Sequence, residues 1–294
     1  MKVLVTGITG FIGKRLLLQL GTVDEITVVS RKVVSGFPKN VTVIQADLNE
    51  PKGLFDRLKV IRPEACVHLA WEGIPNYGAD LSRRNFEQGK RLLRHLVEEC
   101  GCSKIIAAGS CWEYGKPDGT CSEEERPEKF PKVSLDFTRV KRSLSDIGFE
   151  LARKPGMSFI WVRIFYAYGP GQREGSLIPT MTQALNNNEC PAVKTPHNAN
   201  DFIHVDDIAE ALNLMVHKKN MQTGIYNLGT GKPTKVWEIC EYLEKALGKS
   251  PIWSKQLRDM KVESTANFWA DMSKTTDALG WSPKISIEEG LKRL

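Results

Sequence analysis

The sequence lacks the features that define several large classes of protein. No apolar run approaches the length needed to cross a bilayer, and the chain opens on MKVLVTG without the charged segment and apolar core of a secretion signal. Its seven cysteines are an odd number, and the lone Cys100-x-Cys102 pair has no second pair to complete a tetrahedral metal site. We therefore expect a cytoplasmic protein with reduced thiols and no metal ion.

A block of charge of one sign is also missing. The 41 Lys and Arg residues are spread along the chain, and the net charge is only +6. This pattern does not predict a nucleic-acid partner; it fits a solvated surface, and a small anionic ligand would explain the surplus equally well. What remains is an ordinary globular composition, in which 294 residues provide one large domain or a domain with a smaller lobe.

Short runs rich in β-branched residues alternate with longer amphipathic stretches, which predicts βαβ units and a parallel sheet. The predicted strands are Lys2–Thr6, Glu25–Ser30, Val41–Ala46, Ala65–Leu69, Lys104–Ala108 and Phe159–Ile164, with helices between them such as Ile12–Leu20 and Leu81–Cys100. We predict an α/β fold with a Rossmann-type doubly wound parallel sheet in residues 1–168 and a smaller C-terminal α/β substrate lobe in residues 169–294. Returning segments near 202–225, such as Phe202–Val205, are predicted to pack on the first domain and complete the sheet edge.

A glycine-rich turn follows the first predicted strand and opens a helix. Glycines permit a tight turn and let backbone N–H groups approach a pyrophosphate, which then lies at the positive end of the helix. The strand before the turn and the amphipathic helix after it agree with this interpretation. The turn therefore predicts a dinucleotide site, the alternative being a glycine turn without a ligand; its predicted cofactor-binding residues are Gly7, Thr9, Gly10, Phe11, Ile12 and Gly13.

The end of the second predicted strand indicates which dinucleotide is preferred. An NAD site usually carries an acidic side chain there for the ribose 2′-hydroxyl. This chain has Ser30, Arg31 and Lys32 instead, and two cations with a hydroxyl suit a 2′-phosphate. We predict NADP as the cofactor, with NAD as the alternative and exposed loop charges as the interpretation without function.

From these residues onward the sequence resembles the extended short-chain dehydrogenase/reductase family, and more narrowly its nucleotide-sugar epimerases, dehydratases and 4-ketoreductases. The similar motifs run nearly end to end: the turn at 7–13, Asp47-Leu48, His68-Leu69-Ala70, Asn85, the segment 109–115, Arg163 through Tyr168-Gly169-Pro170, the segment 201–207, the segment 226–231 and the segment 280–283. The resemblance implies that Asp47, Leu48, Leu69, Ala70 and Asn85 contact the cofactor.

The resemblance also implies a hydride relay. In the family a Tyr four residues before a Lys acts as general acid/base, and a Ser or Thr hydroxyl holds the substrate oxygen. By position Ser110 is the hydroxyl, and Lys141 is the cation that also anchors the nicotinamide ribose.

The catalytic Tyr position holds Phe137, which has no ionisable proton. Three explanations stay open: an engineered Tyr-to-Phe variant that traps a complex, a natural protein that uses another donor, or a protein that has lost the chemistry and only binds. If another donor is needed, Tyr114, Tyr166 and Ser110 are nearest in the motifs.

Other departures from the family narrow the reaction. Cys111 and Trp112 stand where the 4,6-dehydratases carry Asp-Glu, which disfavours dehydration. Tyr166 replaces the Asn of the R-x-x-N-x-YGP element, and Asn200 replaces the Arg usual before Asp-Phe, so the standard grip on the diphosphate is in doubt. Arg173 and Arg258 are candidates for phosphate contacts, with surface arginines as the alternative. The predicted substrate-binding residues are Trp71, Cys111, Trp112, Tyr166, Arg173 and Arg258.

The leading hypothesis is NADP-dependent reduction of the C4 ketone of a nucleotide-activated deoxysugar. The Ser-Cys-Trp-Glu-Tyr-Gly segment looks like that of the reductases that complete abequose- or talose-type sugars. A nucleotide-sugar 4-epimerase with bound NAD is the runner-up, and a non-catalytic dinucleotide-binding protein is the third hypothesis. The resemblance further implies a homodimer that pairs helices near Leu81–Cys100 and Thr138–Arg153.

Overall fold

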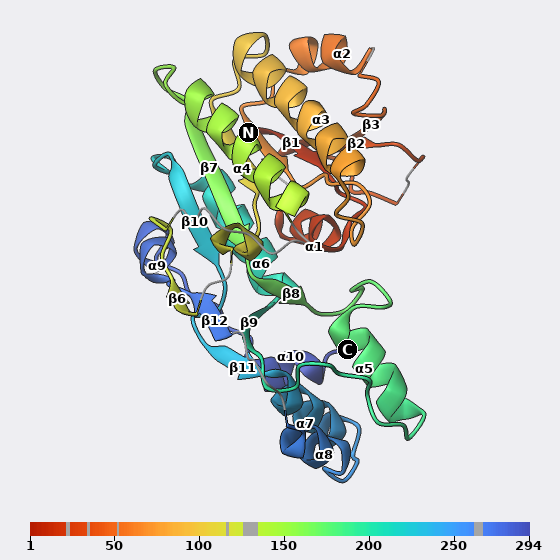
Figure 1. The fold of residues 1–294 in the computed structure, drawn as a ribbon. Helices are drawn as coiled ribbons and strands as arrows, with labels where there is room; N and C mark the ends of the chain where they lie inside the picture. The colour runs from red at the N-terminus through yellow and green to blue at the C-terminus, as the bar shows by residue number, and fades with distance from the viewer. Residues whose placement is uncertain (22–23, 34–35, 52, 116–117, 126–134, 262–266) are drawn as a thin grey trace. The chain divides into compact units, whose positions relative to one another are not determined.

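The structure is a computed structural model that describes residues 1–21, 24–33, 36–51, 53–115, 118–125, 135–261 and 267–294. The chain folds into two compact units, each assembled from separated segments (Figure 1). The first contains Met1–Gly115, Arg126–Arg163 and Ala209–Tyr226, and the second contains Lys116–Glu125, Ile164–Ile208 and Asn227–Leu294. The boundary predicted at residues 168 and 169 lies close to the division at 163 and 164.

A seven-stranded sheet forms the centre of the first unit, with the strand order β10-β7-β5-β4-β1-β2-β3. Neighbouring strands from β7 through β3 pair in parallel. The strands are β1 (Lys2–Thr6), β2 (Glu25–Ser30), β3 (Val41–Gln45), β4 (Ala65–His68), β5 (Lys104–Ala108), β7 (Ser158–Ile164) and β10 (Gly224–Leu228). The six strands predicted from the β-branched runs are thus confirmed, with ends shifted by one residue at most.

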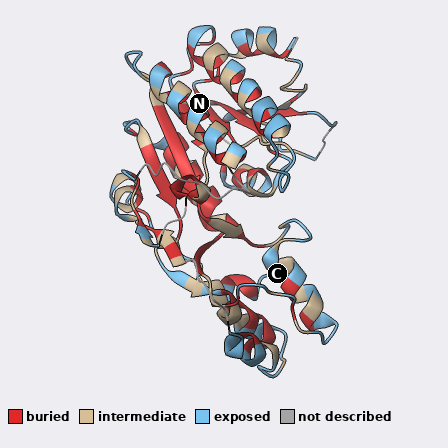
Figure 2. Ribbon diagram, viewed as in Figure 1, coloured by how far each residue is buried: buried red, intermediate tan, exposed pale blue. Residues whose placement is uncertain are grey.

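Five helices and one short 3-10 helix accompany the large sheet within the described residues. They are α1 (Phe11–Gln19), α2 (Leu54–Ile61), α3 (Ala79–Glu98), α4 (Leu135–Leu151) and α6 (Val205–His217), with a short 3-10 helix η1 at Cys111–Tyr114. Apolar side chains of α2, α3 and α4 pack in one cluster with alternate residues of the sheet, such as Leu4 and Ile105. The intervening strand residues, such as Val3 and Ile106, are also buried, so both faces of the sheet are covered (Figure 2). The predicted Rossmann-type architecture is confirmed.

The second unit contains a smaller sheet, ordered β11-β9-β12-β6, with β8 paired to β9. Its strands are β6 (Gly119–Cys121), β8 (Tyr166–Tyr168), β9 (Ala199–His204), β11 (Pro233–Lys235) and β12 (Asn267–Ala270). Its helices are α5 (Leu177–Asn186), α7 (Val236–Ala246), α8 (Trp253–Asp259), α9 (Ser273–Leu279) and α10 (Ile287–Leu291). A second apolar cluster, which includes Tyr168, Phe202 and Leu243, holds these elements together.

One prediction about the sheet edge is wrong. Residues 202–205 were expected to complete the edge of the large sheet, but β9 pairs with β8, β11 and β12 in the second unit. The edge position next to β7 is taken by β10 instead. An apolar run identifies a strand, but its partner depends on long-range pairing that a local pattern does not contain.

Buried Asp201 anchors the second sheet. Its carboxylate accepts hydrogen bonds from the backbone N–H groups of Thr230 (2.7 Å), Gly231 (2.9 Å) and Ala270 (3.1 Å), and from the Thr230 hydroxyl (2.6 Å). Burial raises the pKa of Asp201, although these donors act in the opposite direction. In the segment 201–207, which resembles a family motif, Asp201 is therefore needed to accept these hydrogen bonds within the second unit. Within the described ranges, no helix combines the length and hydropathy that crossing a bilayer requires.

Candidate dinucleotide site and catalytic cluster

A cavity of about 180 Å³ lies at the carboxyl ends of β1 to β4 in the first unit. The strand order reverses at this point, because β2 and β3 follow on one side of β1 and β4 lies on the other. Open α/β sheets bind ligands at such switch points. The cavity is lined by Gly7, Thr9, Gly10, Val29, Ser30, Arg31, Ala46, Asp47, Leu48, Asn49, Leu69, Ala70, Trp71, Glu72 and Gln88.

The glycine turn after β1 has the geometry of a cradle for an anion. Gly7 has a φ of +80°, and a Cβ there would lie 2.6 Å from the backbone nitrogen of Ala70. A Cβ on Gly13 would lie 2.2 Å from the carbonyl oxygen of Gly7, so α1 packs directly on the turn. No side chain caps α1, and its first turn carries no acidic residue. The positive end of the helix is therefore available to a phosphate, and these residues fit a dinucleotide.

Neighbouring strand ends are fixed to one another by hydrogen bonds. The Thr6 hydroxyl lies 2.7 Å from Nδ1 of His68, and the backbone N–H of Leu69 donates to the carbonyl oxygen of Thr6 at 3.1 Å. Burial lowers the pKa of His68 to about 3, and nearby Lys141 acts in the same direction. His68 is therefore neutral near pH 7 and serves as a structural hydrogen-bond partner of Thr6, in the positions just before the cavity residues Gly7 and Leu69.

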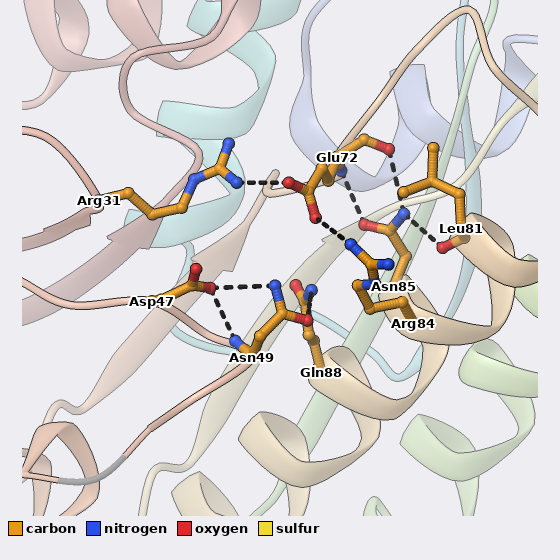
Figure 3. Close-up of polar contacts among 8 residues, drawn as sticks. All are labelled: Arg31, Asp47, Asn49, Glu72, Leu81, Arg84, Asn85 and Gln88. Atoms are coloured by element: carbon orange, nitrogen blue, oxygen red, sulfur yellow. Dashed lines mark hydrogen bonds and ion pairs between the residues drawn. The ribbon is translucent and has the colours of Figure 1, made fainter.

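A polar network joins the turns after β2, β3 and β4 to helix α3 (Figure 3). After β3, the Asp47 carboxylate accepts hydrogen bonds from the backbone N–H of Asn49 at 2.8 Å and from its side-chain amide at 3.1 Å. The Gln88 amide on α3 donates to the side-chain oxygen of Asn49. Across the cavity, Arg31 after β2 forms an ion pair with Glu72 after β4.

The structure brings most of the predicted cofactor residues to one cavity. Among the described residues, Phe11, Ile12, Gly13, Lys32, Asn85 and Lys141 are the predicted cofactor residues that do not line it. Asn85 is buried, and it accepts a hydrogen bond from the backbone N–H of Glu72 at 2.7 Å and donates to the Glu72 carbonyl oxygen at 3.1 Å. Its position shows that it holds the loop after β4 on α3.

Lys141 lies near Phe137 in a buried cluster next to β5. Its ammonium group donates to the carbonyl oxygen of Ala108 at 2.6 Å and lies 3.9 Å from the centre of the Trp71 ring. Burial lowers the pKa of Lys141 to about 7, although Glu113 acts in the opposite direction. Near pH 7 this side chain therefore divides between its charged and neutral forms, which is a property of groups that take part in proton transfer.

Ser110 caps the short helix η1, and its position depends on a buried carboxylate. The Ser110 hydroxyl accepts a hydrogen bond from the backbone N–H of Trp112 at 3.2 Å, and the backbone N–H of Ser110 donates to Glu113 at 2.7 Å. Glu113 also accepts from the Trp161 indole at 2.9 Å and lies 3.5 Å from Nε of Arg163. Burial raises the pKa of Glu113 against the opposing effect of Arg163. These contacts fix the turn that presents Ser110.

Aromatic rings surround Phe137, which is 5% exposed. Its ring centre lies 5.3 Å from that of Trp71, 6.2 Å from that of Trp112 and 5.1 Å from that of Tyr77. Tyr77 belongs to the loop after β4 and also contacts Trp112, with ring centres 4.9 Å apart. A phenol therefore packs against the ring that replaces the phenol of the family.

The substrate candidates fall into both units. Trp71, Cys111 and Trp112 lie in the first unit, where Cys111 is buried and both tryptophans contact Phe137. The other three lie in the second unit. There Tyr166 packs against Phe202, Arg173 is exposed after the Gly169–Gly171 turn, and Arg258 on α8 lies 5.7 Å from the Trp237 ring centre.

Four further residues of the site were not predicted from the sequence: Asn49, Glu72, Tyr77 and Gln88. Gln88 had a weak signal, because it follows Asn85 by three residues and therefore shares its face of α3. Glu72 and Tyr77 had no such signal in the sequence, because they lie in an irregular loop where residue spacing does not indicate which way a side chain points. Their roles depend on contacts with residues far away in the sequence.

Comparison with known proteins agrees with this geometry. Residues 3–229 match the NAD-dependent epimerase/dehydratase family. UDP-glucuronate 4-epimerase of Thermodesulfobacterium geofontis is 28% identical, covering 99% of this chain and 94% of the relative. CDP-abequose synthase of Salmonella muenchen is 24% identical, covering 100% and 96%.

Among solved structures, MoeE5 in complex with UDP-glucuronic acid and NAD has a TM-score of 0.82 and 25% identity, covering 100% of this chain and 97% of that one. A crystal structure of UDP-glucuronic acid 4-epimerase from Bacillus cereus with NAD has a TM-score of 0.80 at 22% identity, covering 100% and 97%, which shows the same fold. The family match spans more than half of the chain and includes the glycine turn, the cavity and the Lys141 cluster. The chain therefore belongs to the NAD-dependent epimerase/dehydratase family, whose members are enzymes.

Proposed function

We propose that this enzyme reduces the C4 ketone of a nucleotide-activated deoxysugar with NADPH as the electron donor. The observation that carries the proposal is the cavity at the switch point, which is lined by basic Arg31 at the end of β2 and by Trp71, whose ring centre lies 3.9 Å from the Lys141 ammonium group. The full-length similarity to a CDP-abequose synthase supports the sugar class. The dinucleotide, when bound, supplies the hydride.

The cofactor choice is supported by the residues after β2. No acidic side chain directly follows Ser30; Arg31 lines the cavity, and Lys32 is the next residue in the chain. A guanidinium group binds a phosphate through two parallel hydrogen bonds and suits a 2′-phosphate. MoeE5 and the Bacillus cereus epimerase were solved with NAD, so NAD is the alternative cofactor.

In the proposed reaction, Ser110 donates a hydrogen bond to the substrate oxygen, and Lys141 contributes positive charge beside the nicotinamide ribose. Phe137 has no proton to give, so a ketone that receives hydride must take its proton from another group. Tyr114 is an unsuitable donor, because it is 2% exposed and Arg163 packs 4.4 Å from its ring centre. Tyr77 is partly exposed and contacts Phe137, and we assign it the role of proton donor.

The substrate-binding roles of Trp71, Cys111, Trp112, Tyr166, Arg173 and Arg258 are part of the same proposal. The two tryptophans offer flat apolar surfaces beside Phe137. Arg173 and Arg258 carry charge that suits a diphosphate. Replacing either arginine by Met is expected to raise KM for the sugar nucleotide more than it lowers kcat.

The test is an assay of the purified chain with 4-keto nucleotide sugars and NADPH. We expect loss of NADPH absorbance with one equivalent of alcohol product formed for each NADPH consumed. A 4-epimerase is the second candidate, supported by the UDP-glucuronate 4-epimerase relative. An epimerase would interconvert nucleotide sugars without added dinucleotide. The absence of turnover on every keto-sugar, both in this chain and in Phe137→Tyr, would instead indicate a protein that only binds dinucleotide.

A further inference from the structure

The cavity after β2 and β4 is crossed by an ion pair that the family resemblance does not anticipate. The Arg31 guanidinium bonds to Oε1 of Glu72, so the group expected to bind a 2′-phosphate already holds a carboxylate (Figure 3). Both residues line the cavity. Any phosphate that reaches Arg31 must therefore compete with Glu72.

Glu72 lies between two guanidinium groups. Its second oxygen, Oε2, is buried without a hydrogen-bond partner among the described residues and lies 4.0 Å from Nη1 of Arg84 on α3. The carboxylate therefore has a second cation towards which it can turn when Arg31 is taken by another anion. Because Oε2 is buried, the carboxylate has to turn before this oxygen can accept a hydrogen bond from a hydroxyl group in the cavity.

The backbone of Glu72 is held independently of its side chain. The Asn85 amide bonds both the N–H and the carbonyl group of Glu72, and it also donates to the carbonyl oxygen of Leu81 at 2.9 Å. A change of the Glu72 side chain therefore alters the charge in the cavity while leaving the loop in place. This separation makes Glu72 a residue whose electrostatic role can be measured.

We propose that Glu72 sets the preference of this enzyme between NADPH and NADH, by holding Arg31 and by opposing a 2′-phosphate in the cavity. The inference deepens the proposed function and rests on its dinucleotide site. An acidic side chain from the β4 loop thus takes the place of the acidic residue usually found at the end of β2. The Glu72 carboxylate would accept a hydrogen bond from a ribose hydroxyl. A 2′-phosphate would instead have to displace the carboxylate from Arg31 towards Arg84.

The size of the expected change in cofactor preference follows from the solvent exposure of the Arg31 and Glu72 side chains. The Arg31 side chain is 58% exposed and that of Glu72 is 25% exposed, so solvent screens the pair and its loss has a modest effect. Repulsion between the carboxylate and a doubly charged phosphate adds to that effect. Together they are expected to change the ratio of the two affinities about tenfold at low salt.

The experiment compares dissociation constants for NADPH and NADH in the intact chain, measured by calorimetry at low and high salt. Glu72→Gln should shift the ratio about tenfold towards NADPH, and the shift should shrink as salt is added. In an Arg31→Met background the same change should shift the ratio by less than in the native chain, because only the repulsion between the carboxylate and the phosphate remains. Asp80→Asn is the matched control, since Asp80 is an exposed carboxylate on α3 that pairs with Arg83 and does not line the cavity.

An unchanged ratio in Glu72→Gln, or a shift towards NADH, would overturn the inference. The outcomes separate it from the proposed function. If the native chain reduces keto-sugars with NADPH but Glu72→Gln leaves the ratio unchanged, only the role of Glu72 is refuted. If the native chain binds NADH better and Glu72→Gln shifts the ratio towards NADPH, the role of Glu72 holds and the NADP preference is refuted. If the chain binds neither dinucleotide, both are refuted.

Discussion

Removing the Tyr77 hydroxyl tests where the proton of the reaction comes from. Phe137 occupies the position of the expected acid, and the Tyr77 ring lies against it with ring centres 5.1 Å apart. General acid catalysis contributes about 10²- to 10⁴-fold, so Tyr77→Phe should lower kcat by at least about 10²-fold. NADPH binding should stay unchanged, because Tyr77 does not line the dinucleotide cavity.

The structure also predicts how to rescue that variant. The ammonium group of Lys141 lies 5.8 Å from the centre of the Phe137 ring. At an effective dielectric constant of about 20, the charged form of Lys141 at this distance stabilises a phenolate by about 3 kcal/mol, so the fraction of Lys141 that is protonated lowers the pKa of a phenol introduced at position 137. Phe137→Tyr combined with Tyr77→Phe should therefore recover most of the lost kcat. Phe137→Tyr alone should change kcat only several-fold, since the native chain already has a donor.

The assay is steady-state NADPH oxidation with a saturating keto-sugar, together with the pH dependence of kcat. A single Tyr77→Phe variant that keeps the native kcat would refute the assignment. So would a gain of more than about 10²-fold in Phe137→Tyr alone, because that gain would mean that the native chain has no donor at all. Thermal unfolding of each variant checks that the fold is intact.

Four further predictions concern stability and assembly. Burial lowers the pKa of Lys141 from 10.5 to about 7, so between these pH values the unfolded chain binds more protons than the folded chain. The free energy of unfolding therefore rises with pH across that window. Lys141→Met should remove up to about 1.4 kcal/mol per pH unit of this slope, which denaturant titrations at several pH values measure. Gly13→Ala should destabilise the first unit by about 1–3 kcal/mol and weaken dinucleotide binding, because its Cβ would collide with the backbone of Gly7; equal melting temperatures would contradict the close packing. Asp201→Ala should lower the free energy of unfolding by about 3 kcal/mol or more, because buried N–H groups of the second unit lose their acceptor. An unchanged denaturation midpoint would show that water replaces the Asp201 carboxylate. The homodimer through α3 and α4 stays a prediction, which light scattering tests directly; a monomeric mass at micromolar concentration would refute it.

Much of the first unit was predictable because its signals are local. The run Val3-Leu4-Val5 is apolar at consecutive positions, and only a strand covered on both faces satisfies that pattern. The glycine spacing at 7, 10 and 13 had one physical explanation, a tight turn that opens a helix, and the structure shows the close approaches that require it. Parallel strands joined by helices place their carboxyl ends at one edge, and the predicted cofactor residues Gly7, Ser30 and Asp47 accordingly line one cavity.

Other features depend on contacts between residues that are distant in the sequence. The sequence showed that Arg31 is basic, but only the folded chain brings Glu72 to it across 41 positions. It showed that Phe137 lacks a proton, but only the loop after β4 places Tyr77 beside that ring. The apolar run at 202–205 was identifiable as a strand, whereas its sheet was not, because strand pairing is decided by competition among all available edges.

The sequence by itself thus determined the class of fold, the position of the phosphate turn and the absence of the usual acid at residue 137. These properties reside in short stretches whose backbone geometry follows from residue type and spacing. The tertiary structure alone decided which side chains face one another, such as Glu72 beside Arg31 and Tyr77 beside Phe137. The reason is that side-chain partners are chosen by long-range packing, which local propensities do not encode.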